Sequence, residues 1–217
     1  MISSRELKET PGGGYDFSNW RVELAQQLGL VPVYTPVTED FVLLLLYLDG
    51  RAPFYGEEIL HLCFFLYPYV RVKASPTLFI PLSSDVEKAV LSLKEKGLVE
   101  ERKEFRGGRY VNTVRLSDQG VSEARKVFST FANSWILTND FVLRKGAEMI
   151  SELEALKKTY NDKTPLELLK VLASKIDSEG EAFVKRLNLE SERRERMIID
   201  IGKQLLRDLK LLTREFY

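Results

Sequence analysis

The sequence predicts a mainly α-helical protein that carries one two-stranded β-hairpin between its helices. Apolar residues recur at spacings of three and four over most of the chain, which is the period of helices packed on one side. In the middle of the chain, Gly107-Gly108 separates two strand-like runs, 98–105 and 110–116. A Gly-Gly pair in that setting indicates a hairpin turn, because both residues accept positive φ angles.

Residues 1–37 are expected to form an arm followed by a short helix. Pro11–Gly14 fits no regular element, so residues 1–17 are predicted to be a mobile arm. Ser18 can cap a helix that runs to about Leu28. Three apolar residues share one face of this helix: Trp20, Leu24 and Leu28.

Three helices are predicted before the hairpin, at about 38–48, 56–66 and 83–96. The first is apolar on nearly every side, which is typical of a buried helix, and Thr38 can cap it. The segment 67–82 contains prolines and no helical period. It is expected to form an irregular or partly extended insert before the third helix.

After the hairpin, Ser117 is expected to cap a helix, as Ser83 or Ser84 caps the helix before it. Residues 132–217 are predicted to be a wholly helical extension. Its longest run, 189–217, carries apolar residues at mixed spacings of 3 and 4, as in a coiled-coil seam, so we expect it to join two copies in a homodimer. Packing against the chain's own helices is the alternative. The residues assigned to the dimer face are Ile198, Ile201, Leu205, Leu209, Leu212 and Phe216.

The composition excludes several classes of protein. With one histidine and one cysteine in 217 residues, the chain lacks a Cys/His metal set and an internal disulfide. Both residues, His61 and Cys63, lie in an apolar run and are interpreted as core residues. No enzyme activity, metal site or cofactor is therefore predicted. The apolar runs are shorter than the roughly 20 residues of a membrane span, so we expect a cytoplasmic protein with no membrane partner.

The charge distribution decides whether a nucleic acid can be a partner. The whole chain is balanced, with 32 basic and 32 acidic side chains. Residues 83–128 hold ten basic against eight acidic side chains, which is a small positive excess over the third helix and the hairpin. Overall neutrality therefore does not exclude DNA, but it limits the expected affinity.

The order helix, helix, helix, hairpin, helix over 38–131 predicts a winged helix-turn-helix domain. In that fold the third helix lies in the DNA major groove, and the hairpin, or wing, contacts the backbone or the minor groove. Arg106 and Arg109 flank the turn, where the wing reaches furthest. The residues assigned to DNA contact are Ser84, Lys88, Ser92, Lys94, Arg102, Lys103, Arg106, Arg109 and Arg115.

Two family resemblances agree with this fold. The helix end, wing and following helix cap resemble those of MarR- and PadR-type winged-helix regulators in the stretch GLVEERKEFRGGRYVNTVRLSDQG. A wider stretch, about 38–176, is similar in order to the Panacea (SocA antitoxin-like) families and their archaeal relatives through FVLLLLYLDGRAPFYGEEILHLCFFLYPY, PLSSDVEKAVLSLKEKGLVEER and KTYNDKTPLELLKVLASKI. These resemblances imply regulation by binding, of DNA in some families and of a toxin or adaptor protein in others.

The predicted function is a DNA-binding transcription regulator that acts as a homodimer. The alternative is an antitoxin-like winged-helix adaptor that binds another protein and not DNA. Asp85 and Glu87 on the third helix favour that alternative, because carboxylates repel phosphates and attract a basic partner. The aromatic residues around 47–69 are interpreted as core, with a small-ligand pocket as the less favoured alternative.

Overall fold

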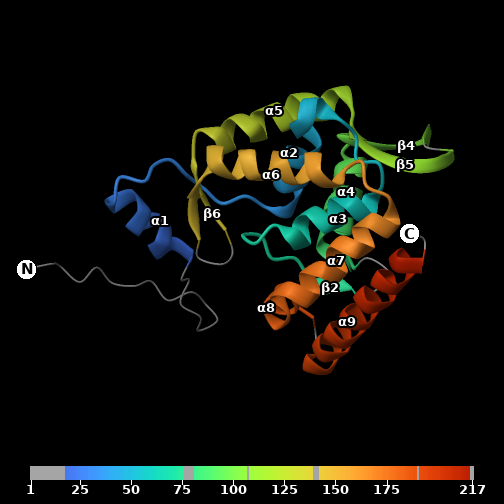
Figure 1. The fold of residues 1–217 in the computed structure, drawn as a ribbon. Coiled ribbons are helices and arrows are strands. Elements are labelled where there is room, and N and C mark those ends of the chain that lie inside the picture. Colours follow the sequence, from blue (N-terminus) through green and yellow to red (C-terminus); the bar gives the residue numbers. More distant parts are fainter. Residues whose placement is uncertain (1–17, 76–80, 107, 139–141, 190, 216–217) are drawn as a thin grey trace, which may run out of the picture.

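The computed structural model describes residues 18–75, 81–106, 108–138, 142–189 and 191–215. Within these ranges the protein is mainly helical, and its short strands form three small sheets (Figure 1). The elements up to the hairpin are α1 (Ser18–Gln27), β1 (Val33–Tyr34), α2 (Thr38–Arg51), α3 (Glu57–Leu66), β2 (Ala74–Ser75), β3 (Leu82–Ser83) and α4 (Ser84–Glu95). The hairpin and later elements are β4 (Val99–Arg106), β5 (Arg109–Leu116), α5 (Asp118–Ala132), β6 (Trp135–Leu137), β7 (Leu143–Lys145), α6 (Gly146–Tyr160), α7 (Pro165–Glu179), α8 (Glu181–Arg186) and α9 (Glu192–Glu215). The arm predicted at 1–17 lies outside the described residues.

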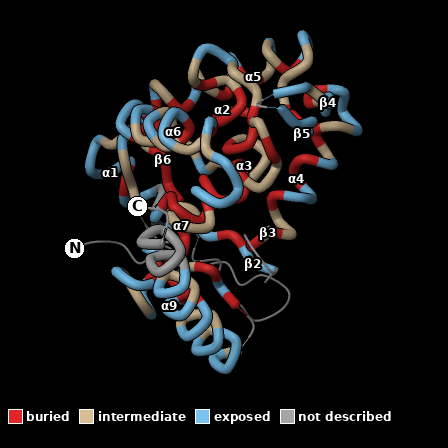
Figure 2. The backbone as a smooth tube through the Cα atoms, turned by 45° about the vertical axis from the view of Figure 1, so that its right-hand side comes forward, coloured by how far each residue is buried: buried red, intermediate tan, exposed pale blue. Residues whose placement is uncertain are grey.

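Helix α2 forms the centre of the fold because it is apolar on every side. Residues 41–46 are all buried, and α2 packs against α4, α5 and α6. Helix α3 is buried from Ile59 to Leu66, so the two helices form the red interior of Figure 2. His61 and Cys63 lie in this core, fully buried, and burial raises the pKa of the Cys63 thiol to about 12. A thiol in that state is a packing group and not a nucleophile.

The predicted hairpin is confirmed. Strands β4 and β5 pair antiparallel over their whole length, and Arg106 lies opposite Arg109 at the end next to the turn. At the base, Phe54 adds a third backbone segment beside β5: the Phe54 N–H donates to the Val114 carbonyl at 2.9 Å, and the reverse bond measures 3.0 Å. The base is therefore fixed to the turn between α2 and α3, while the tip extends beyond the helices (Figure 1).

Two of the four predicted helix caps are confirmed, at Ser83 and Ser117, whereas the cap at Ser18 stays a prediction. The Ser83 hydroxyl accepts from the Val86 N–H, and the Ser117 hydroxyl accepts from the Gly120 N–H. The expectation that Thr38 caps α2 is wrong, because Val37 is the residue that precedes the helix. Its N–H donates to the Asp40 carboxylate at 2.8 Å, which is the contact that the third helical residue makes in a capping box, and no side chain takes the place of the hydroxyl cap.

Residues 132–217 are not wholly helical. Strand β6 pairs in parallel with β1 and antiparallel with β7. The β6 sequence, Trp135–Leu137, combines an aromatic with a β-branched residue, a composition that favours strands. Strand β7 follows closely in the sequence, but the parallel partner β1 lies about a hundred residues earlier, and no local pattern indicates that pairing.

A buried lysine joins α6 to the end of α2. Residues 48–50 leave the helical conformation, so carbonyls in the last turn of α2 lack their usual N–H donors. The Lys157 ammonium replaces those donors: Nζ lies 2.9 Å from the Leu45 carbonyl, 2.9 Å from the Leu48 carbonyl and 2.6 Å from the Ala52 carbonyl. Burial lowers the pKa of Lys157 to about 8.

The C-terminal helices pack mainly on one another. Helix α9 lies along α7, with α8 beside both. The contact is close at Gly202, where an added Cβ would stand 2.7 Å from Ile176 Cγ2. This close approach fixes which side of α9 faces the rest of the chain. By contrast, the predicted apolar face of α1, with Trp20, Leu24 and Leu28, is exposed.

Candidate nucleic-acid interface

Helix α4, the candidate recognition helix, lies against the core by one face. Its buried residues are Val86, Ala89, Val90 and Leu93. The opposite side presents Glu87, Lys88 and Glu95 to solvent, together with Leu91, which is 56% exposed. This outer side carries two carboxylates against one ammonium, so it offers no long-range attraction to phosphates.

A buried histidine fixes the start of α4, a role that its place in an apolar run did not suggest. The Ser83 N–H donates to His61 Nδ1 at 3.0 Å. Because Nδ1 accepts, the ring proton is assigned to Nε2, which faces a Glu57 carboxylate oxygen at 3.6 Å. The histidine holds the pKa of the Glu57 carboxyl below its usual range. His61 thus positions the start of α4.

Two of the predicted α4 residues are turned away from a free outer face. Ser92 is half-buried and faces Glu39 of α2: the Lys96 ammonium first, and then the Ser92 hydroxyl, hydrogen-bond that carboxylate and lower its pKa. Lys94 pairs with Glu101 of the wing. Ser84 is half-buried, which leaves Lys88 as the exposed predicted contact on this helix.

At the base of the wing the basic residues are neutralised. Arg115 donates to Glu100 at 2.7 Å, and Arg102 approaches the same carboxylate at 3.1 Å. Both arginines lower the pKa of Glu100. The predicted contacts at Arg102 and Arg115 therefore share one carboxylate: Arg115 pairs with Glu100 across the two strands, and Arg102 pairs with it along β4.

The tip of the wing has a different character. Among the described residues, Lys103 and Arg109 have no ion-pair partner and are exposed. Arg106 pairs with Asp162 at 2.7 Å and lies 3.5 Å above the centre of the Tyr55 ring. That ion pair is exposed on both sides and is worth little in water, so a phosphate can compete for the guanidinium.

The wing tip also carries an aromatic pair that is not among the predicted site residues. Phe105 and Tyr110 are cross-strand neighbours, and their rings meet edge to face with centroids 5.2 Å apart. They are 67% and 74% exposed. The position of the glycine turn in the sequence already indicates that the two residues are cross-strand neighbours. Their exposure could not be predicted, because it follows from the hairpin extending past the helices.

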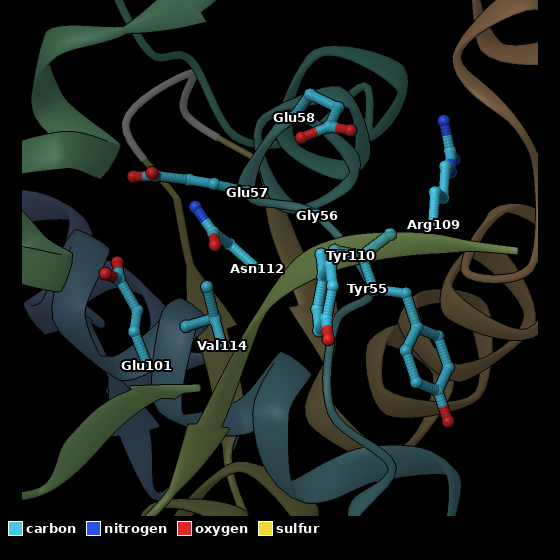
Figure 3. Close-up of a pocket in the computed structure, with 10 residues that line it drawn as sticks. Tyr55, Gly56, Glu57, Glu58, Glu101, Arg109, Tyr110, Asn112 and Val114 are labelled. Carbon is cyan, nitrogen blue, oxygen red and sulfur yellow. The ribbon is translucent and has the colours of Figure 1, made fainter. Parts of the chain in front are cut away.

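A groove of about 330 Å³ lies between the start of α3 and strand β5 (Figure 3). Three carboxylates line it, from Glu57, Glu58 and Glu101, together with Tyr110 and Arg109 at the tip end. A DNA backbone that crossed the groove would meet these carboxylates. Contact with phosphates is thus more favourable at the tip than at the base of the wing.

The predicted dimer face on α9 is divided by the fold. Ile198 packs against the apolar core, and Leu205 is half-buried. Ile201 is exposed, as is Met197 four residues before it. The side chains of Leu209 and Leu212 lie outside the described part of the chain, and Phe216 lies outside the described residues altogether.

Searches for other sites and for relatives give no further candidate. In the described ranges no group of three or more His, Cys, Asp or Glu side chains is placed to hold a metal ion, and no described helix has the length and apolarity that a bilayer crossing needs. Comparison with protein-family models, curated protein sequences and solved structures gives no significant match.

Proposed function

We propose that residues 38–132 form a winged-helix domain and that this domain binds duplex DNA. The order α2, α3, α4, β4, β5, α5 agrees with that fold, as does the short third segment at Phe54 beside β5. The observation that carries the DNA assignment is the projecting basic tip, where Lys103, Arg106 and Arg109 surround exposed aromatic rings. Basic and aromatic side chains on a narrow projection are typical of nucleic-acid contact.

In this proposal the wing supplies most of the affinity. The tip cations contact phosphates or enter the minor groove, as guanidinium groups do where that groove is narrow. Helix α4 approaches the major groove with Lys88, although Glu87 and Glu95 on the same side oppose its charge. Because phosphate contacts carry little sequence information, we expect weak binding with modest sequence preference.

The test is fluorescence anisotropy with a labelled 30-base-pair duplex at low salt. The wild-type protein should bind, and Lys103→Ala/Arg109→Ala should weaken binding about tenfold. The control, Lys185→Ala/Arg196→Ala, removes the same charge from α8 and α9, where each residue is exposed beside a glutamate of its own helix. If the two double variants bind alike, or if the wild type does not bind, the DNA proposal is wrong.

A second candidate function is an adaptor that binds a basic segment of another protein. It is favoured by the carboxylates of the groove and by exposed Leu91, since interfaces between proteins combine apolar anchors with charge complementarity. The variant Glu58→Gln/Glu87→Gln separates the two functions. It should strengthen DNA binding by removing repulsion, but it should abolish binding of an arginine-rich peptide if the adaptor function is correct.

We also propose that the protein is a homodimer through α9. Met197 and Ile201 lie one turn apart and are exposed, so they form an apolar strip on the side of α9 that does not face α7. A two-fold dimer would present two wings to one duplex. Light scattering should give twice the mass of one chain, and Met197→Asp/Ile201→Asp should give a monomer; a monomeric wild type overturns the dimer.

A further inference from the structure

The aromatic pair at the wing tip is the largest unexplained apolar feature of the hairpin. Phe105 and Tyr110 are two-thirds or more exposed, whereas most large apolar residues of α2 and α3 are buried. An edge-to-face ring pair stabilises a hairpin by about 0.5–1.5 kcal/mol. That purpose would be served as well by a pair near the base of the hairpin, where the rings would also be covered.

The pair lies on the side of the hairpin that faces α4. Residues two apart on a strand share a face, and Glu101, on the same face as Phe105, pairs with Lys94 of α4. Lys103 and its cross-strand neighbour Asn112 stand between them. A duplex that runs along α4 and the wing would therefore meet this face, and the aromatic rings would be its outermost side chains.

The dimensions of the DNA minor groove decide how far the tip of the hairpin can enter it. The minor groove of B-form DNA is about 6 Å wide and 7.5 Å deep, whereas two paired strands are already about 4.8 Å apart between their backbones. The hairpin backbone therefore stays outside, and only side chains of the tip reach the base pairs. Phe105 and Tyr110 are one residue pair away from the turn-flanking pair Arg106–Arg109, which is within that reach.

Resting on the DNA-binding function, we propose that Phe105 and Tyr110 act as a wedge against a base-pair step in the minor groove. Lys103 shares the face of the rings and the Arg106–Arg109 pair lies on the opposite face, so these cations hold phosphates on both sides of the wedge. Partial insertion of an apolar ring unstacks one step and bends the duplex. Its cost is lowest at pyrimidine–purine steps, which are the most flexible. The wedge thus gives the wing a preference for duplexes that contain TA steps.

The test compares two duplexes of equal length, charge and composition. One alternates A and T, so every second step is TA; the other is an uninterrupted A-tract paired with T. A wing that uses only its arginines prefers the A-tract, because that minor groove is narrow and strongly negative. A wing that uses the aromatic wedge prefers the alternating duplex, and we expect the wild type to bind it about tenfold more tightly.

Two variants connect this preference to the rings. Phe105→Ala/Tyr110→Ala should lose the preference for the alternating duplex, and Tyr110→Phe, which keeps the ring, should retain it. A 2-aminopurine placed at a TA step should brighten on binding of the wild type, because unstacking relieves its quenching, and should not brighten with the alanine variant.

Each result has a distinct meaning. If the wild type binds DNA but prefers the A-tract, or binds without change in 2-aminopurine fluorescence, the wedge is overturned and the DNA-binding function stands. If no duplex is bound at low salt, both are overturned. Since the preference is measured on the wild type, a folding defect in the alanine variant leaves that comparison of the two duplexes unaffected.

Discussion

Lys157 offers the most direct test of how α6 is held to the core. Its ammonium donates three short hydrogen bonds to carbonyls at the end of α2, and bonds from a charged donor are worth about 1.5–3 kcal/mol each. Opposing them is the cost of burying the charge. The fall in pKa from 10.5 to about 8 corresponds to about 3 kcal/mol. Lys157→Met should therefore lower the free energy of unfolding by about 3 kcal/mol, the balance of these two effects.

The measurement is urea unfolding followed by circular dichroism, with thermal unfolding alongside. For a chain of this size, about 3 kcal/mol corresponds to a fall in Tm of roughly 10 °C. Lys158→Met is the matched control, because Lys158 is exposed beside Glu154 and such pairs contribute under about 1 kcal/mol. If Lys157→Met costs no more than the control, the hydrogen bonds only offset the burial of the charge, and the reasoning fails.

Three further predictions concern the pH dependence, the α7–α9 contact and the start of α4. Between about pH 8 and 10.5 the unfolded chain binds more protons at Lys157 than the folded one, so the stability difference between wild type and Lys157→Met should grow with pH over that window; a constant difference contradicts the lowered pKa. Gly202→Val should loosen α9 from Ile176, since even a Cβ is too close, and limited proteolysis should cut α9 faster than in a Lys203→Ala control. His61→Leu removes the acceptor of the Ser83 N–H and should cost about 1–3 kcal/mol in urea unfolding, whereas a cost near zero would mean that Ser83 finds another acceptor.

Local signals explain which parts of the fold could be predicted from the sequence. The hydroxyls of Ser83 and Ser117 accept hydrogen bonds from N–H groups only three residues later. The glycine turn likewise lies between the two strands that it joins. Lys157 is different: it bonds carbonyls more than a hundred residues earlier. In the sequence it is one of two adjacent lysines near the end of α6. The strand at 135–137 could not be predicted for the same reason.

The same distinction between local patterns and long-range contacts applies to the candidate site. The hairpin and its basic residues could be predicted from the sequence, because strand alternation and the glycine turn define both. The sequence could not show that Arg115 is paired with Glu100 while Arg109 has no ion-pair partner in the described part of the chain, because cross-strand pairing depends on rotamers and on the exact register. Nor could it show that α9 turns Ile198 inward and Ile201 outward, since that choice depends on the close contact at Gly202.

If the proposed DNA binding is correct, its salt dependence reports how many wings engage one duplex. Each wing tip holds three cations, Lys103, Arg106 and Arg109, so one copy neutralises about three phosphates. At about −0.9 per phosphate, the slope of log K against log salt concentration is roughly −3 for one wing and roughly −5 for two. Arg109→Ala should make the slope less steep by about one unit in a monomer and by about two in a dimer. The slope counts the phosphates that are contacted and does not depend on the net charge of the chain. A slope near zero would therefore exclude phosphate contact by the wing and leave the adaptor function.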